Sequence, residues 1–398
     1  MWIRCSFAVV RIKMLFFAQP QPALMNSLNL QYNPRIDQLR WLAATIVFLF
    51  HFQLEYRGLG GPALVTPWAG LITEGHTGVG LFFTLSGFLF MQIALHQRAI
   101  VYGDFVRNRV LRIFPLFLTI FLVATSIGRD NFQPQDLLYV FATNLGHAPT
   151  SGTPITGAAW TISLEFLFYM VFPFLARFAM ERGPGYLLNL LLLMFFFKLS
   201  AYTVNENSTL MYFCTFVGRF DQFLIGMLAA MLYQQPRIRG RLHALSPWLL
   251  LISFALVVCD TAALHRYAPF GATPKSVFWI FWSMIESLGW AIFILAWVSF
   301  QPRLPAPIER VLCHGGKVSF SFYLLHMALL HLLATQVGMV RLVGNGWIDA
   351  AIMILITYVA TWLLATLSYN TIEEPFLRMR RHYGKDKSTR IGEIATTQ

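Results

Sequence analysis

Two ionisable residues, Arg40 and His51, flank an apolar segment that begins at Trp41. At about 100° and 1.5 Å per residue, their spacing places both side chains on one face of a helix, roughly 16 Å apart along its axis. An arginine binds phosphate through paired charge-assisted hydrogen bonds, and a histidine serves as a general base. The pattern is also typical of an arginine held at a membrane surface and a histidine satisfied by a neighbour, so the spacing alone leaves both interpretations open.

A second basic cluster, formed by Arg107, Arg109 and Arg112, precedes Pro115. Arg109 and Arg112 are neighbours on a helix surface because they are three residues apart. Paired guanidinium groups at the end of a membrane span fit a ligand that carries phosphate. Retention of basic residues on the cytoplasmic side of a membrane explains the cluster equally well.

A carboxylate, Glu165, interrupts the apolar run 159–178. Such a group is costly in a bilayer unless it is protonated or partnered, so it marks a candidate functional site. Glu286 is equally anomalous within 277–300, and we assign it no role. Further polar and aromatic side chains are candidates for lining a site: Asp37, Ser86, Trp160, Ser163, Tyr169, Ser321 and His326.

Membrane helices are the elements that must position these residues. The chain is 57% hydrophobic and 12% charged, whereas a soluble domain carries about 25% charged residues. Apolar runs of about 20 residues, long enough to cross roughly 30 Å of hydrocarbon, recur along the chain. We therefore predict an all-α, polytopic integral membrane helix bundle of about ten transmembrane helices. The expected spans are 41–55, 77–95, 113–127, 159–178, 185–203, 212–233, 246–264, 277–300, 318–340 and 348–370.

The distribution of basic residues predicts the orientation of this bundle. Most of the 30 lysines and arginines fall in the N-terminal segment, in alternate loops and in the C-terminal tail. Because basic loops are retained in the cytoplasm, both termini are expected there, as an even number of spans requires. The net charge of +12 does not indicate a nucleic-acid partner, since the charges lie in loops rather than on a groove-facing element.

The expected domain organisation is simple. Residues 1–33 form an N-terminal extension without assigned function, in which Met25 is an alternative start. Residues 34–377 form one membrane domain, and residues 378–398 form a basic cytoplasmic tail. The four cysteines have no metal-type spacing, so we expect neither a metal site nor a disulfide framework.

A series of ordered motifs within 34–377 resembles those of the acyltransferase family 3 integral membrane proteins. The motifs are Arg40 to His51, Gly78 to Phe88, Arg109 to Pro115, Trp160 to Tyr169, Arg219 to Gly226, Ser319 to His326 and Glu373 to Phe376. The resemblance implies transfer of an acyl group, acetyl in our expectation, from a cytoplasmic coenzyme A thioester to a hydroxyl of an extracytoplasmic carbohydrate or glycosylated acceptor. It also implies the bacterial inner membrane, a lipid environment, acyl-CoA as a donor substrate and no resident cofactor.

Joined to the helix geometry, the resemblance assigns roles to individual residues. The phosphates of acyl-CoA would bind Arg109 and Arg112, helped by Arg107 and Arg40. His51 would act as the general base toward the acceptor hydroxyl. The third catalytic candidate, Glu165, would orient His51 or stabilise its charge.

The chain departs from the family pattern at two positions. Gln38 replaces a glycine, which we expect to matter little, and Gly80 stands where the family often has an acidic residue. Glu74 or Asp37 could supply the missing carboxylate. We expect Ser86 and its following glycine to mark a close helix contact rather than a nucleophile.

Two function classes remain as alternatives. A proton-coupled secondary transporter would use His51, Glu165 and His326 as a proton relay, but it does not account for the arginine pair in its motif context. A structural or regulatory membrane protein would predict that alanine variants of Arg40, His51 and Glu165 behave alike and mildly.

Overall fold

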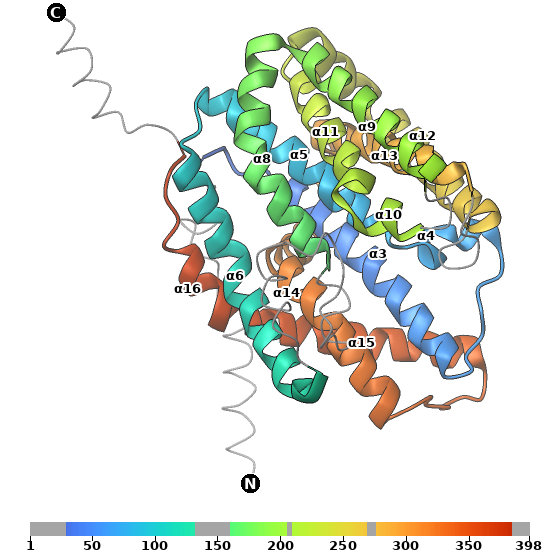
Figure 1. Ribbon diagram of the computed structural model, residues 1–398. Helices are drawn as coiled ribbons and strands as arrows, with labels where there is room; N and C mark the ends of the chain where they lie inside the picture. The colour runs from blue at the N-terminus through green and yellow to red at the C-terminus, as the bar shows by residue number, and fades with distance from the viewer. Residues whose placement is uncertain (1–28, 132–159, 205–208, 269–275, 384–398) are drawn as a thin grey trace, which may run out of the picture.

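The computed structural model describes residues 29–131, 160–204, 209–268 and 276–383 (Figure 1). No strand occurs within these ranges. The long helices are α3 (Pro34–Gly58), α5 (Thr77–Gln97), α6 (Tyr102–Ile127), α8 (Trp160–Arg182), α9 (Pro184–Val204), α11 (Phe216–Tyr233), α12 (Pro236–Tyr267), α13 (Phe278–Ser299), α14 (Ala306–Gln336) and α15 (Gly346–Ser368). Short elements are η1 (Pro67–Ala69), α4 (Gly70–Thr73), η2 (Arg129–Asn131), α10 (Thr209–Cys214), the π-turn η4 (Tyr369–Glu373) and α16 (Glu374–Leu377). Most of the predicted N-terminal extension and C-terminal tail lies outside the described residues.

Helix α3 runs through the middle of the bundle, where it packs against α14 and α5 (Figure 1). Its start is determined locally, because Pro34 occupies the first turn and the Asn33 side chain accepts a hydrogen bond from the backbone N–H of Arg35 at 3.0 Å. The close approach of α14 requires Gly316, since a Cβ there would lie 2.5 Å from the carbonyl carbon of Asp37. Local capping and a glycine contact therefore place α3 between its neighbours.

Helices α5 and α11 also meet through their backbones. A Cβ at Gly87 would lie 3.0 Å from the carbonyl carbon of Phe223, and one at Gly226 would lie 2.9 Å from the backbone nitrogen of Phe88. Small residues at an interface between membrane helices permit this approach. The predicted close helix contact at Ser86 and Gly87 is confirmed for Gly87.

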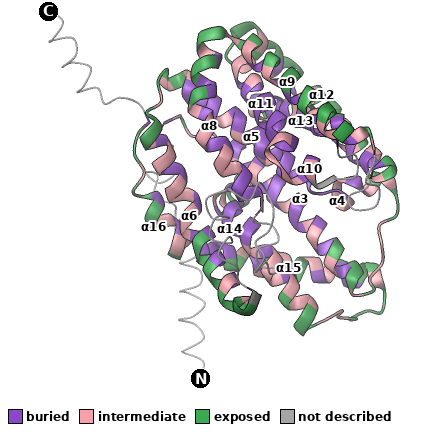
Figure 2. Cartoon of the chain, viewed as in Figure 1, coloured by how far each residue is buried: buried purple, intermediate pink, exposed green. Residues whose placement is uncertain are grey.

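The exposed surface identifies the bundle as a membrane protein. Nine of the described helices are long and apolar enough to cross a bilayer, and α3, with 25 residues, is a tenth long helix with more polar residues. Figure 2 shows burial concentrated on central helices such as α3 and α5, while α9 and α12 are largely exposed. These outer helices present large apolar side chains, among them Leu192 at 55% and Phe196 at 51% exposure on α9. Such faces fit lipid rather than water, and the predicted all-α polytopic bundle is confirmed.

Both ends of the described chain lie at the same face of the bundle. The backbone N–H of Tyr383 donates to the side-chain oxygen of Asn29 at 2.8 Å, and the Gln97 side chain donates to the Asn29 carbonyl at 3.0 Å. An even number of spans requires this placement. The assignment of that face to the cytoplasm remains a prediction from the basic residues.

Several helices begin well before the predicted spans: α6 at Tyr102, α12 at Pro236 and α14 at Ala306, where the sequence predicted 113, 246 and 318. The arginine cluster and the predicted span 113–127 form one continuous helix, α6, with Pro115 inside it, because a membrane helix tolerates a proline whose lost hydrogen bond is compensated locally. The predicted span 212–233 is broken at Thr215 into α10 and α11. The side chain of Thr215 ends the continuity by accepting a hydrogen bond from Gly218 N at 3.2 Å, as an N-cap does.

Candidate functional site

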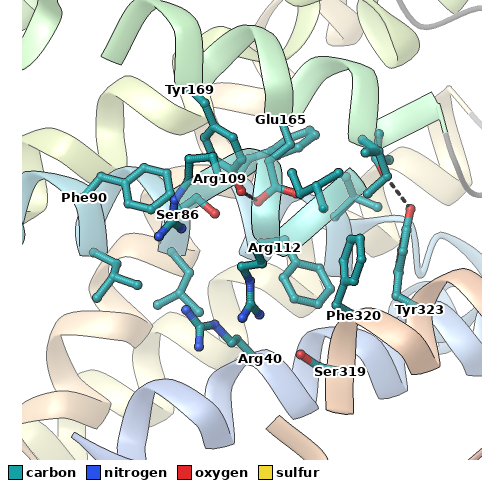
Figure 3. Close-up of a pocket in the computed structure, with 18 residues that line it drawn as sticks. Arg40, Ser86, Phe90, Arg109, Arg112, Glu165, Tyr169, Ser319, Phe320 and Tyr323 are labelled. Atoms are coloured by element: carbon teal, nitrogen blue, oxygen red, sulfur yellow. Dashed lines mark hydrogen bonds between the residues drawn. The ribbon is translucent and has the colours of Figure 1, made fainter. Parts of the chain in front are cut away.

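A pocket opens between α3, α5, α6, α8 and α14, and the space between its walls, open solvent at the mouth included, is about 740 Å³ (Figure 3). Its polar lining residues are Arg40, Ser86, Arg109, Arg112, Thr161, Glu165, Tyr169, Ser319 and Tyr323. Apolar side chains such as Val79, Phe82 and Phe320 form the remaining wall. Candidates predicted separately on four stretches of sequence therefore converge on one cavity.

Arg40 and Arg112 face each other across this pocket. Figure 3 shows their guanidinium groups turned toward one another, from α3 and α6 respectively. Arg40 forms an ion pair with Asp37, Nη1 to Oδ1 at 3.1 Å, so Asp37 neutralises part of the charge without lining the pocket. Arg112 has no hydrogen-bonded partner among the residues that the structure describes. Two cations that face each other in a partly dry site repel unless an anion lies between them, which makes this pair an anion-binding geometry.

Arg109 lies deeper and is held by aromatic rings. Its side chain is buried, its Nη2 donates to the hydroxyl of Tyr383, and its guanidinium carbon lies 5.0 Å from the ring centre of Phe90 and 5.7 Å from that of Tyr169. Cation–π contacts of this kind fix a guanidinium in place. Arg107, predicted as a helper on the same helix, does not line the pocket, because two residues of α-helix rotate it to another face.

Glu165 contributes a carboxylate to the same pocket. The hydroxyl of Tyr169, one helix turn later, donates a hydrogen bond to it. Arg112, Arg109 and Arg40 all lie within electrostatic reach of this carboxylate. Glu165 therefore balances the arginines of the pocket, and its side-chain partner is a tyrosine.

At its inner end the pocket is bounded by hydroxyl groups. The hydroxyls of Thr161 and Tyr323 lie 2.9 Å apart and link α8 to α14. One turn further along α14, His326 contacts the backbone carbonyl of Tyr323 through Nδ1 at 2.5 Å. His326 therefore lies one helix turn from the lining residue Tyr323, although it does not line the pocket itself.

His51 pairs with His326 and not with Glu165. The Nδ1 atom of His51 lies 2.9 Å from Nε2 of His326 and 3.1 Å from the carbonyl oxygen of Val47. The predicted support of His51 by Glu165 is therefore absent. His326, which the sequence predicted as a lining residue and as a member of the alternative proton relay, holds that position. His51 itself lies beyond the lining residues of the pocket.

The carbonyl contacts assign the tautomers of the two histidines. A carbonyl oxygen only accepts, so His326 carries its proton on Nδ1 toward Tyr323, which leaves its Nε2 as an acceptor. His51 then carries its proton on Nδ1, shared between Val47 and His326. The Nε2 atom of His51 is left unprotonated, with no hydrogen-bonded partner among the described residues, and this is the protonation state that a general base requires.

Three other predicted lining residues lie outside the pocket. Trp160 stacks its ring 5.2 Å from that of Phe213. Ser163 is buried, and its hydroxyl has no hydrogen-bonded partner among the described residues. Ser321 donates to Glu373 in the π-turn η4, so it joins two helices rather than lining the cavity.

A buried charge network, not predicted from the sequence, lies beside α5. Arg219 and Glu286 approach to 3.5 Å with both side chains fully buried, and Gln222 donates to Glu286 at 2.5 Å. Next to them Lys198 pairs with Asp221 at 2.5 Å. The sequence shows the charges within apolar segments, but it does not show which helices bring them together.

This network accounts for the departure at Gly80. A Cβ built on Gly80 would collide with the carboxylate of Glu286, whose Cδ atom would lie 2.8 Å away. A carboxylate from α13 therefore occupies the space that a side chain at position 80 would fill. Neither of the predicted substitutes does so, since Glu74 pairs with His76 at 3.1 Å and Asp37 pairs with Arg40.

A further cation, Arg380, lies within electrostatic reach of Arg112 and Arg109, although it does not line the pocket. Partial burial, together with the positive charges of Arg112 and Arg109, lowers the pKa of Arg380 to about 10. The basic side chains of Arg109, Arg112 and Arg380 are therefore close enough to repel one another, which an anion bound near them would relieve.

Fold and pocket together define a multi-pass membrane protein with a charged cavity inside its helix bundle. The family model described as an acyltransferase domain matches residues 33–366, and the chain belongs to this acyltransferase family. The chain is 26% identical to acyltransferase MdmB of Streptomyces mycarofaciens, over 87% of this chain and 92% of that protein. It is 25% identical to nodulation protein 10 of Rhizobium leguminosarum bv. viciae, over 86% and 93% of the two chains.

A more distant similarity connects the chain to larger proteins. It is 21% identical to a putative O-acetyltransferase of Staphylococcus aureus (strain MSSA476), over 87% of this chain and 58% of that protein. No solved structure matches the chain at a significant level. The protein is thus a membrane acyltransferase, as the sequence motifs predicted.

Proposed function

We propose that this acyltransferase moves an acyl group, acetyl in the first instance, from cytoplasmic acyl-CoA to a hydroxyl of an extracytoplasmic carbohydrate or glycosylated acceptor. The proposal includes the bacterial inner membrane as its location. The observation that carries it is the convergence of Arg40, Arg109 and Arg112 on one pocket inside an acyltransferase bundle. The printed name of the Staphylococcus aureus relative, a putative O-acetyltransferase, supports an oxygen acceptor and an acetyl group.

The donor would enter with its phosphates on the arginines. Arg40 and Arg112 face each other at the pocket, and guanidinium groups bind phosphate oxygens through paired charge-assisted hydrogen bonds. The thin pantetheine arm would lie along the apolar wall that contains Val79 and Phe320. The thioester would then reach the Thr161–Tyr323 end, one turn of α14 from His326.

The histidine pair would perform the proton transfer. The free Nε2 lone pair of His51 removes the proton from the acceptor hydroxyl as its oxygen attacks the thioester carbonyl. The bond from carbonyl carbon to sulfur breaks, and the coenzyme A thiolate takes up the proton, so an ester and a free thiol are the products. His326 holds the His51 ring through their 2.9 Å contact, which is the supporting role that an orienting group has in a catalytic triad.

The transporter alternative has less support. It required one relay through Glu165, His51 and His326, whereas Glu165 bonds Tyr169 and the two histidines bond each other. The relay is therefore divided into two separate hydrogen-bonded groups.

Transfer of radiolabelled acetyl from acetyl-CoA by membranes that contain the protein tests the proposal. The variant His51→Ala should lose at least the roughly 10²–10⁴-fold contribution of general base catalysis, and His331→Ala, a histidine on α14 away from the pocket, should retain activity. Near-normal transfer by a folded His51→Ala variant would refute the role of His51. Failure of wild-type membranes to label any acceptor from acetyl-CoA or longer acyl-CoAs would refute the proposed reaction.

A further inference from the structure

The segment 381–383 is docked onto the N-terminal half of α6. The side chain of Asn108 forms two hydrogen bonds with the backbone of Arg381, donating at 2.6 Å and accepting at 2.8 Å. The backbone N–H of Val101 donates to the carbonyl of Tyr383 at 3.0 Å. The match to the family model ends at residue 366, so this segment lies outside the matched range.

Docking places the side chain of Tyr383 behind the pocket. Tyr383 is 1% exposed, and its ring packs 5.3 Å from that of Phe105. Its hydroxyl accepts the hydrogen bond from Nη2 of Arg109. A buried tyrosine could pack equally well as phenylalanine, so the hydroxyl is the part that acts on the arginine.

Arg109 connects this tyrosine to the charged interior of the pocket. Its guanidinium carbon lies 5.8 Å from the ring centre of Tyr383 and 5.7 Å from that of Tyr169. Tyr169 in turn donates to Glu165. The Nε atom of Arg109 is buried and has no hydrogen-bonded partner among the described residues, although the side chain lines the pocket. The guanidinium is therefore enclosed by aromatic rings and hydrogen-bonded to Tyr383, and its Nε remains a donor without a partner among the described residues.

We propose that Tyr383 is a positioning residue of the donor pocket. The segment 381–383, which Asn108 binds, holds the Tyr383 hydroxyl against Arg109. This arginine then presents its remaining N–H groups to a phosphate of acyl-CoA. The inference rests on the proposed function and adds a residue outside the matched domain to its donor site. An arginine side chain has several rotatable bonds, so a fixed partner reduces the ordering that phosphate binding otherwise requires.

The test is the affinity of purified, full-length protein in detergent for radiolabelled acetyl-CoA. Tyr383→Phe keeps the ring and removes the hydroxyl, and loss of a hydrogen bond to a charged group should raise Kd about tenfold or more. Asn108→Ala, which releases the segment without touching the pocket, should raise Kd in the same direction. Because both changes act through one contact, the double variant should bind about as weakly as the weaker single variant.

The matched control is Tyr56→Phe, which removes another buried tyrosine hydroxyl, one that donates to the Gly346 carbonyl at 3.2 Å far from the pocket. Its Kd should stay within about twofold of the wild-type value. A second ligand separates positioning from general packing: S-acetylpantetheine, which lacks all phosphates, should compete equally well in all variants.

Each outcome decides a different question. An unchanged Kd in both folded variants would overturn the role of Tyr383, and so would equal weakening of acetyl-CoA and S-acetylpantetheine, which indicates packing alone. If Tyr383→Phe fails to fold, Asn108→Ala carries the same comparison. Absence of acetyl-CoA binding in the wild type would refute the proposed function and this inference with it, whereas wild-type binding with unaltered variants refutes the inference alone.

Discussion

Replacing Gly80 with alanine is expected to displace the carboxylate of Glu286 and to destabilise the bundle. The added methyl group would lie 2.8 Å from Cδ of Glu286 and closer still to its oxygen. Glu286 is 0% exposed and holds Gln222 at 2.5 Å and Arg219 at 3.5 Å. It therefore cannot move aside without weakening the contacts that satisfy a fully buried arginine.

The magnitude follows from these contacts. Overpacking a buried site costs about 1–3 kcal/mol, and separating a buried ion pair costs about 3–5 kcal/mol. The higher helix propensity of alanine returns about 1 kcal/mol. After this gain is subtracted, strain alone would cost about 0–2 kcal/mol and a broken pair about 2–4 kcal/mol. We therefore expect Gly80→Ala to lower the free energy of unfolding by about 1–3 kcal/mol, between these two limits.

Thermal unfolding of the purified protein in one detergent measures the effect. Gly240→Ala is the matched control, because a Cβ at that helical glycine meets nothing within 4 Å. In the background of Glu286→Ser, which shortens the obstructing side chain, the additional Gly80→Ala change should cost much less than it does alone. A Gly80→Ala protein as stable as Gly240→Ala, or a cost that is unchanged by Glu286→Ser, would refute the assigned contact.

Two further predictions concern the polar pairs inside the bundle. His326→Ala should reduce acetyl transfer by up to about 100-fold, because it releases the ring of His51 from its position. The same change should have no additional effect in a His51→Ala background; additive losses in the transfer assay would show that the histidines act separately. Lys198→Ala leaves the carboxylate of Asp221 buried without its cation and should destabilise the protein by about 3–5 kcal/mol; a melting temperature equal to that of the wild type would contradict the ion pair.

The sequence predicts the membrane architecture well because each span is a local property. A run of apolar residues such as 277–300 crosses a bilayer regardless of its partners, and the nine long apolar helices and the central α3 correspond to these runs. Boundaries are less certain, because they depend on caps and tertiary contacts, as the continuous α6 and the break at Thr215 show.

The candidate site is partly predictable for the same reason. Arg40, Arg112 and Glu165 are conspicuous as charges in or beside apolar runs, and the structure brings them to one pocket. The contacts between them depend on tertiary geometry. His51 bonds His326, 275 residues away, and Gly80 meets Glu286 across α5 and α13; no spacing rule within one helix predicts either pair.

The burial of Tyr383 was also not predictable from the sequence. Tyr383 lies in a stretch that reads as a basic tail, where polar composition favours disorder. Its burial depends on Asn108 and Asn29, which bind the backbone of this segment. Because these asparagine side chains bind backbone atoms, the identities of residues 381–383 give no sign of the contact.

Binding of radiolabelled acetyl-CoA to the purified protein, with Arg112→Ala beside it, tests the central claim most directly. Arg112 faces the pocket without a hydrogen-bonded partner among the described residues. Its replacement should therefore leave the fold intact and weaken the binding of the acyl donor about tenfold or more, the cost of losing a charge-assisted contact. The control Arg177→Ala removes an exposed arginine that is 74% accessible and paired only with Glu181 among the described residues. Saturable wild-type binding that Arg112→Ala weakens and Arg177→Ala does not is the predicted result. No saturable binding of acetyl-CoA or longer acyl-CoAs, or equal affinity in all three proteins, would contradict the assignment of the arginine pocket to the acyl donor.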